Sequence, residues 1–278
     1  MFRGRKCNMG KCEVEKMINY TLSPEMIVMV SGSGIGTQVK DYDDGMWYKQ
    51  NKAGYEGIAE CLSSKVLACS NIRDFVMYHT CKINGKDGCV SKNFLRPTES
   101  YISIQRLYDI YYEGKLDDAI RRLDSVKERI AYVKDFILSK TALDITEYLG
   151  KMLTFDMLIL NTDRHFNNFG IIVDKTTDSY RFGPVFDNGN ALLSNVLEFP
   201  FDLPIGENIQ NVYGKPFSAK LEIQALEAGF GLKVNYDEVK RILKKEKDSR
   251  ALSTLMLQLD RYEDIIKDNS IVAETVSV

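Results

Sequence analysis

The chain has 278 residues, of which 44% are hydrophobic and 27% are charged, so it can bury a sizeable core and is not mainly disordered. Its 37 Lys and Arg residues nearly balance 39 Asp and Glu residues, which excludes the basic excess of a dedicated nucleic-acid-binding protein. The sequence has no run of about 18 uncharged apolar residues, so we predict a cytoplasmic protein with no membrane partner.

The first third of the sequence is typical of a small β-rich lobe. Asp43-Asp44-Gly45 is a hairpin turn signal between two short predicted strands. A helix should follow, because Ile58 and Leu62 lie at helical spacing in an apolar pattern. We expect strands over residues 37–42, 46–50 and 89–95, and helices over residues 55–68 and 72–80.

Beyond Pro97 the sequence changes to long amphipathic helices of mixed charge. We expect these helices over residues 103–112, 116–138, 144–160, 220–228, 236–245 and 249–267. No Pro- or Ser-rich linker separates the two parts, so a hinge should join them. The predicted fold class is therefore α+β with two lobes, a small β-rich N-terminal lobe over residues 1–95 and a larger helical C-terminal lobe over residues 96–278.

One polar segment interrupts the helical part. Residues 161–170 read NTDRHFNNFG and follow directly on an apolar run. So many polar side chains would be costly to bury without partners. Strands are predicted over residues 169–173 and 180–186, and the second ends at Asp187-Asn188-Gly189. A hairpin of this kind would bring Asp163, Asn168 and Asp187 close together.

These three side chains are the ones that phosphoryl transfer from ATP requires. The reaction needs a carboxylate beside the accepting hydroxyl, plus an Asp and an Asn that hold Mg²⁺ against the phosphates. The step of five residues from Asp163 to Asn168 equals the Asp-to-Asn step of the protein-kinase catalytic loop, and Asp187 stands where that family has Asp-Phe-Gly. We therefore predict a kinase that uses ATP and Mg²⁺, with Asp163 as the catalytic aspartate and Asn168 and Asp187 as metal ligands.

The pattern Asp163-Arg164-His165-x-x-Asn168, followed by Phe-Asp-Asn-Gly at residues 186–189, resembles the HipA-like serine/threonine kinases. More distantly it is similar to the phosphatidylinositol 3- and 4-kinases. Residues 47–49 and 54–60 also resemble compact bacterial HipA-like proteins, so the resemblance covers roughly residues 27–193. It implies a two-lobed protein-kinase-like fold and a protein substrate with a Ser or Thr hydroxyl. It also implies that the protein can be a toxin with an antitoxin partner, either protein or RNA.

The resemblance implies roles for two further charged residues. Lys49, at the end of a predicted strand, would contact the α- and β-phosphates of ATP, and Glu60 on the next helix would pair with it. Lys52 and Glu56 are the nearest alternatives for these two roles. Arg164 and His165 are expected to position the catalytic loop rather than take part in the chemistry.

Two backbone segments complete the nucleotide site that the resemblance implies. A glycine-rich loop would cover the phosphates, because glycines let backbone amides approach an anion closely. The predicted strand near residue 90 would be the hinge whose backbone meets the adenine. The residues concerned are Ser31, Gly32, Ser33, Gly34 and Gly36 in the loop, and Ser91, Asn93 and Phe94 in the hinge. Residues 193–218 follow Asp187 as an activation segment would, and are expected to shape the substrate site.

Three alternatives stay open from the sequence. The substrate could be a lipid or a small alcohol, although no basic amphipathic membrane-surface helix is evident. The chain could be a non-catalytic binding module with a kinase fold. Residues 163–170 could be an ordinary capped loop, but that reading leaves the acid after Phe186 unexplained. Autophosphorylation is a further hypothesis, with Ser33 and Ser194 as candidate acceptors.

Overall fold

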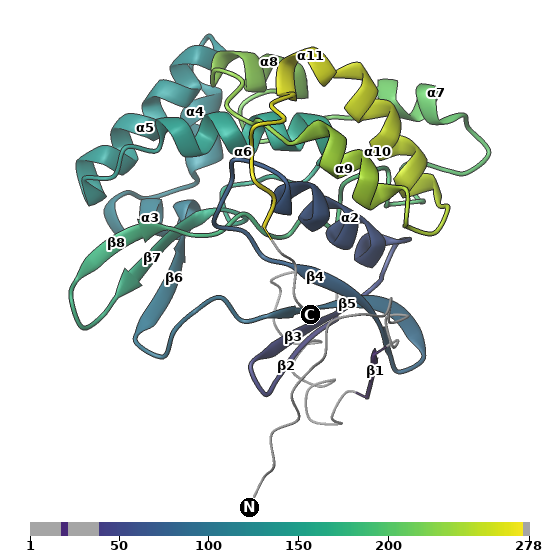
Figure 1. Ribbon diagram of the computed structural model, residues 1–278. Coiled ribbons are helices and arrows are strands. Elements are labelled where there is room, and N and C mark those ends of the chain that lie inside the picture. Colours follow the sequence, from purple (N-terminus) through teal and green to yellow (C-terminus); the bar gives the residue numbers. More distant parts are fainter. Residues whose placement is uncertain (1–17, 22–38, 275–278) are drawn as a thin grey trace, which may run out of the picture.

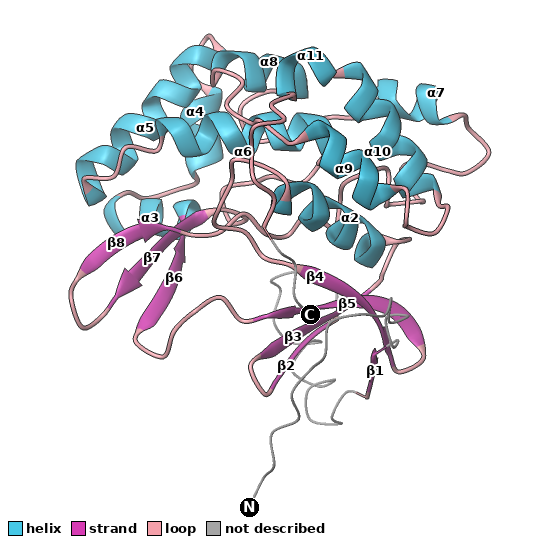
Figure 2. Ribbon diagram, viewed as in Figure 1, coloured by secondary structure: helices cyan, strands magenta, loops and turns pink. Residues whose placement is uncertain are grey.

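The computed structural model of the protein describes residues 18–21 and 39–274 (Figure 1). The predicted glycine-rich loop, residues 31–37, lies outside the described residues. The described part is an α+β structure with two sheets and a helical portion. Figures 1 and 2 show the helices gathered in the upper part of the molecule and both sheets below them.

The first sheet has five strands in the order β1-β4-β5-β3-β2. β1 pairs with β4 in parallel, and the other neighbours are antiparallel. Asp44 and Gly45 between β2 and β3, and Asn84 and Gly85 between β4 and β5, all have positive φ. Two such residues make the tight hairpin turn that matches the twist of the flanking strands. The strands are β1 (Ile18–Tyr20), β2 (Lys40–Asp43), β3 (Met46–Gln50), β4 (Tyr78–Ile83) and β5 (Lys86–Lys92).

Helix α2 (Glu56–Ala68) lies directly against this sheet. A Cβ atom added at Gly57 would lie 2.7 Å from the carbonyl carbon of Gly88 on β5, which is too close for a side chain. The helix therefore approaches the sheet as closely as a backbone can. Glu60 follows Gly57 by about one turn, so its side chain is directed toward Lys49 on the neighbouring strand β3.

The helix predicted over residues 72–80 is wrong. This part of the chain runs without a helix until β4 begins at Tyr78. Its backbone groups bond to distant segments instead, since Val76 donates to the carbonyl of Val185, and Val185 donates to Asp74. Cys81 and Ile83 are buried on either side of the half-buried Lys82, which is the alternation of a strand.

The second sheet consists of three antiparallel strands in the order β6-β7-β8. The β7-β8 hairpin was predicted, whereas β6 was not. The second strand of the hairpin ends at Phe182 instead of Phe186, because Gly183 and Pro184 follow and proline has no N–H for the ladder. The strands are β6 (Glu99–Ser103), β7 (Gly170–Asp174) and β8 (Ser179–Phe182).

The helical portion begins with a break that the sequence analysis missed. Residues 116–138 were predicted as one helix, but Ser125 ends that run by capping a new one. Its side chain accepts from the N–H of Glu128, and the Glu128 carboxylate accepts from the N–H of Ser125. The first helices are α3 (Ile104–Tyr111), α4 (Leu116–Arg121), α5 (Val126–Thr141) and α6 (Thr146–Ile159).

The main core surrounds α6, whose residues 152–159 are all buried. A helix that is enclosed on every side must be nearly apolar, and Asp156 is the ionisable residue of this stretch. The remaining helices are α7 (Ile205–Gln210), α8 (Leu221–Glu227), α9 (Tyr236–Leu243), α10 (Arg250–Arg261) and α11 (Glu263–Ile266). Of these helices, α8 and α10 pack against α6, and α9 packs against α2. Within the described residues no helix is both long and apolar enough to cross a bilayer.

Candidate active site

Lys49 is the centre of a buried ionic cluster between the two parts of the molecule. It lies on β3 and is only 7% exposed. Its Nζ atom is 2.8 Å from Oε1 of Glu60 and 2.8 Å from Oδ1 of Asp187. The same nitrogen donates to the hydroxyl of Tyr78 at 3.3 Å. The structure therefore brings Lys49, Glu60 and Asp187 together from a strand, a helix and a loop, as their proposed roles require.

Glu60 connects the small lobe to the segment after β8. Its second oxygen, Oε2, accepts a hydrogen bond from the backbone N–H of Asn188 at 2.8 Å. Glu56, the alternative partner for a lysine, instead accepts from the N–H of Ala53 at 2.6 Å, at the beginning of α2. Of the two acids, only Glu60 contacts Lys49 in the described structure.

The charges of this cluster stabilise one another. Burial alone would lower the pKa of Lys49, but Asp187 and Glu60 raise it well above its usual value. Burial would raise the pKa of Asp187, but the cations of Lys49 and Lys40 hold it below its usual value. Burial raises the pKa of Glu60, and Lys49 opposes that rise. Lys49 and Asp187 are therefore charged at neutral pH.

The predicted catalytic loop begins where α6 ends. Leu160 adopts a left-handed conformation, with φ of 57°, and turns the chain out of the helix. The buried side chain of Asn161 then donates to Asp156 at 2.9 Å and accepts from the N–H of Asp163 at 3.0 Å. The position of Asp163 is therefore fixed by a polar side chain inside the core.

Arg164 holds the predicted catalytic loop and the segment around Asp187 together. Its side chain is fully buried, and its guanidinium forms an ion pair with Asp156 on α6. Its Nη1 atom donates to the carbonyls of Asn168 at 3.1 Å and Phe186 at 2.8 Å. Its Nη2 atom donates to Oδ1 of Asn188 at 2.6 Å. One side chain thus fixes the chain at Asn168 next to the chain at Phe186, in the positioning role that was expected of it.

Asn168 and Asp187 present oxygen atoms suited to a magnesium ion. The Nδ2 atom of Asn168 donates to the carbonyl of Asp163 at 2.8 Å, and within the described residues its Oδ1 accepts no hydrogen bond. Asp187 has φ of 58°, and its Oδ2 is 3.6 Å from Nζ of Lys40. The described residues contain no group of three or more His, Cys, Asp or Glu side chains arranged as a metal site. Mg²⁺ is commonly held by one or two protein ligands together with substrate phosphates, so this donor set fits it.

The Asp163 carboxylate has partners of its own, separate from the lysine cluster. Its Oδ2 accepts from Nδ2 of Asn190 at 3.1 Å, and its Oδ1 is 2.9 Å from Nζ of Lys215. Nε2 of His165 lies 3.8 Å from Oδ2. The carboxylate is 31% exposed, so an incoming hydroxyl can reach it.

Sequence reasoning missed three residues of this site. Tyr78 went unnoticed because it was assigned to a helix, although its hydroxyl accepts from both Lys49 and the N–H of Asp187. Lys215 lies 52 residues after Asp163, inside the segment expected to shape the substrate site, but no motif marks it. Asn190 follows Asp187 by three residues and could have been included with that motif.

The predicted hinge residues lie at the end of β5 and in the connection that follows it. Ser91 lies inside the five-stranded sheet, paired with Trp47 on β3 and Tyr78 on β4. The strand ends at residue 92, so the connection to the second sheet begins at Asn93, whose N–H donates to the carbonyl of Gly45. The ring of Phe94 packs 5.5 Å from the ring of Phe186. Phe94 therefore contacts the residue before Asp187, while Ser91 belongs to the sheet.

The two candidate autophosphorylation sites differ. Ser194 is 1% exposed, and its hydroxyl donates to the carbonyl of Gly189, so it is not an accessible acceptor in this conformation. Ser33 lies in the glycine-rich loop, outside the described residues.

Comparison with known proteins identifies the fold. No protein-family model and no curated protein matches the sequence. The solved structure of the proinflammatory kinase CtkA of Helicobacter pylori matches over 90% of this chain and 95% of its own, with 15% identity and a TM-score of 0.62. The HipA protein of Shewanella oneidensis MR-1, solved with HipB and operator DNA, matches over 92% of this chain and 74% of its own, with 10% identity and a TM-score of 0.44. The match to CtkA confirms the predicted α+β kinase-like fold.

Proposed function

We propose that the chain is a HipA-like kinase that uses ATP and Mg²⁺ and transfers the γ-phosphoryl group to a Ser or Thr hydroxyl of a protein. The observation that carries this proposal is Lys49, whose Nζ atom lies 2.8 Å from both Glu60 and Asp187. A lysine aimed at phosphates, an acid that orients the lysine and an acid that binds the metal are the arrangement that kinases need. The likeness of fold to a kinase supports it.

In this proposal the lysine cluster binds the nucleotide. Lys49 contacts the α- and β-phosphates, and Glu60 keeps it in place. Oδ1 of Asn168 and the carboxylate of Asp187 hold Mg²⁺, which neutralises negative charge on the phosphates. The glycine-rich loop with Ser31, Gly32, Ser33, Gly34 and Gly36 covers the phosphates, and the connection containing Asn93 and Phe94 meets the adenine.

Asp163 carries out the step on the acceptor side. Its carboxylate orients the substrate hydroxyl and accepts its proton as the oxygen attacks the γ-phosphorus, while the bond from that phosphorus to the β,γ-bridging oxygen breaks and ADP leaves. Asn190 and Lys215 hold the two carboxylate oxygens in place. Most of the rate enhancement then comes from positioning and from charge neutralisation rather than from covalent chemistry.

Two further expectations belong to the same proposal. The lobes meet near residues 95 and 96, in the connection between β5 and β6.

The toxin role and the antitoxin partner come from the sequence resemblance, and they are tested by comparing the growth of cells that express the chain or its Asp163→Asn variant.

Identification of the phosphorylated product tests the proposed substrate class. The protein is incubated with radiolabelled ATP, Mg²⁺, a mixture of cellular proteins and, separately, phosphoinositide vesicles. Phosphoserine or phosphothreonine that depends on Asp163 supports the proposal. Label in the lipid alone assigns the chain to the phosphatidylinositol-kinase-like class, and no transfer to either indicates a binding module.

A further inference from the structure

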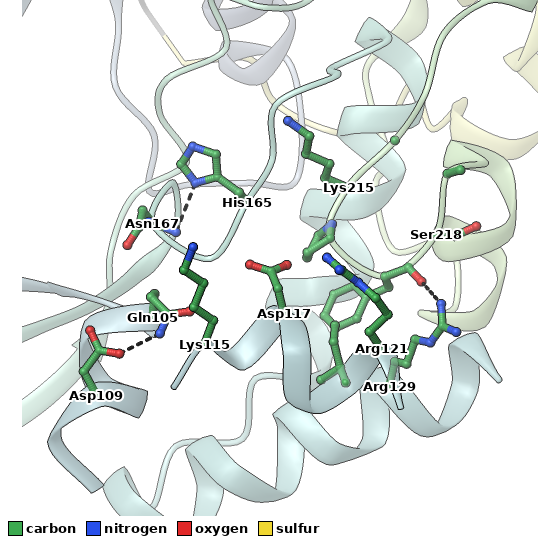
Figure 3. A pocket seen from close by; sticks show the side chains of 15 residues that line it. Gln105, Asp109, Lys115, Asp117, Arg121, Arg129, His165, Asn167, Lys215 and Ser218 are labelled. Carbon is green, nitrogen blue, oxygen red and sulfur yellow. Dashed lines mark hydrogen bonds between the residues drawn. The ribbon is translucent and has the colours of Figure 1, made fainter. Parts of the chain in front are cut away.

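A pocket of about 820 Å³ opens next to the predicted catalytic loop and is lined in part by His165 and Lys215 (Figure 3). Its wall is formed by α3, α4, Arg129 on α5, the end of the predicted catalytic loop and residues 214–219. Two lining residues, His165 and Lys215, are also neighbours of the Asp163 carboxylate. A substrate hydroxyl at Asp163 would therefore place the flanking part of the substrate at this pocket.

Cations outnumber carboxylates among the side chains that line the pocket, although the whole chain has a net charge of −2 and Asp118 and Asp163 pair with Arg121 and Lys215 from outside the lining. Four of its lining side chains are cations and two are carboxylates, which leaves an excess of two positive charges when His165 is neutral. The cations are Lys115, Arg121, Arg129 and Lys215, and the carboxylates are Asp109 and Asp117.

Neutral groups hold one of these cations, whereas two others, Lys115 and Arg121, share the Asp117 carboxylate. Arg129 donates to the carbonyls of Leu123 and Phe217, with N···O distances between 3.0 and 3.2 Å, so neutral groups hold its guanidinium. Arg121 lies 3.8 Å from Asp118, and both side chains are largely exposed. A wall of this kind attracts an anionic group of the substrate.

We propose that this pocket binds an acidic side chain close to the Ser or Thr that is phosphorylated, so that the enzyme selects protein segments with a Glu or Asp near the acceptor. The inference rests on the proposed kinase function. An extended chain advances about 3.3 Å per residue, so residues within about three positions of the acceptor can reach the pocket. Long-range attraction also guides the acidic segment to the site.

The charges favour a single carboxylate over the clustered phosphates of a lipid headgroup. Figure 3 shows the Asp117 carboxylate between Lys115 and Arg121. Its negative charge would repel a group that carries several phosphates more strongly than a single carboxylate, and the lining cations are numerous enough to neutralise one carboxylate. We therefore assign the pocket to an acidic peptide segment.

Peptide binding in the absence of ATP tests this inference. Each labelled peptide has one Ser and a single Glu at one of the three positions before or after it. Fluorescence anisotropy with the intact chain compares its binding with that of a peptide that carries Gln at the same position. We expect at least one Glu peptide to bind about threefold to tenfold more tightly than its Gln partner. Arg121→Glu should abolish this difference. Arg122→Glu, at the neighbouring exposed residue that does not line the pocket, should preserve it.

Three results would overturn the inference. The first is equal binding of all Glu and Gln peptides, including no binding of either. The second is an equal loss of the preference for Glu in the Arg121 and Arg122 variants. The third is binding to phosphatidylinositol phosphate vesicles that depends on Arg121 while peptide binding does not. Because no ATP is present, these outcomes are independent of catalysis. A chain that selects Glu peptides but transfers no phosphate would retain this pocket and refute the kinase proposal.

Discussion

Glu60 accepts a hydrogen bond from the backbone N–H of Asn188 at 2.8 Å, across 128 residues of sequence. Because its other oxygen is bonded to Lys49, this carboxylate fixes α2, β3 and the segment around Asp187 relative to one another. A displacement of α2 would break both bonds. The proposed nucleotide site is therefore complete only when α2 occupies this position.

Replacement of Glu60 by Gln keeps the shape and removes the charge. We expect phosphoryl transfer to fall by about tenfold to a hundredfold, because Lys49 loses one of its two anionic partners. Initial rates at saturating ATP measure the effect. Glu227→Gln, an exposed change on α8, is the control and should leave the rate unchanged. Equal rates in the two variants would contradict the role of Glu60.

Replacement of Arg164 by Met should destabilise the fold strongly. The change leaves the buried carboxylate of Asp156 without its ion-pair partner, which typically costs about 3 to 5 kcal/mol. Urea unfolding measures the change in the free energy of unfolding. The double variant Asp156→Leu/Arg164→Met should lose less than the single variant, because it leaves no unpaired buried charge. A single-variant loss below about 1 kcal/mol would contradict this account.

Lys215 should affect transfer but not folding. It is half exposed and pairs with the carboxylate of Asp163, so Lys215→Ala removes an orienting partner without opening the core. We expect kcat to fall by about tenfold while the ATP affinity and the free energy of unfolding stay the same. Lys220→Ala, at an exposed lysine just before α8, is the matched control. A loss of ATP affinity in Lys215→Ala would place the lysine on the nucleotide side instead.

The charge of Asp187 predicts a stability change at acid pH. The pKa of Asp187 in the folded protein lies below that of an ordinary aspartate. Its charge therefore stabilises the fold fully at pH values above the ordinary pKa, and this stabilisation is lost as the pH falls through the lower pKa of the folded protein. The difference in unfolding free energy between the wild type and Asp187→Asn should be equal at about pH 7 and about pH 5, and smaller at about pH 3. Urea unfolding at the three pH values measures it. A difference already lost at about pH 5 would contradict the depressed pKa.

The local sequence was sufficient to predict the parts of the site that lie in short motifs. The spacing from Asp163 to Asn168 and the acid after Phe186 identified two segments that the hairpin β7-β8 does bring together. Lys49 and Glu60 were also singled out, because the resemblance to HipA-like kinases implies a lysine on this strand and an acid on the next helix.

The rest depends on contacts between distant residues. The segment around Phe75 was predicted as a helix, but its backbone bonds to Val185, 110 residues away in the chain, and no local pattern reports that. Lys215 reaches Asp163 only because residues 214–219 fold back beside the catalytic loop. The break between α4 and α5 was different, because Ser125 and Glu128 form a capping box that the sequence did contain.

The most direct test of the central claim is the rate of γ-phosphoryl transfer from ATP in Mg²⁺ by the wild type and by Asp163→Asn, Asp187→Asn and Asp264→Asn. The last variant changes an exposed aspartate on α11 and serves as the control. We predict that the first two variants stay folded and lose about a thousandfold or more in rate, and that the control keeps the wild-type rate. Near-normal transfer by Asp163→Asn or Asp187→Asn would contradict the proposed site.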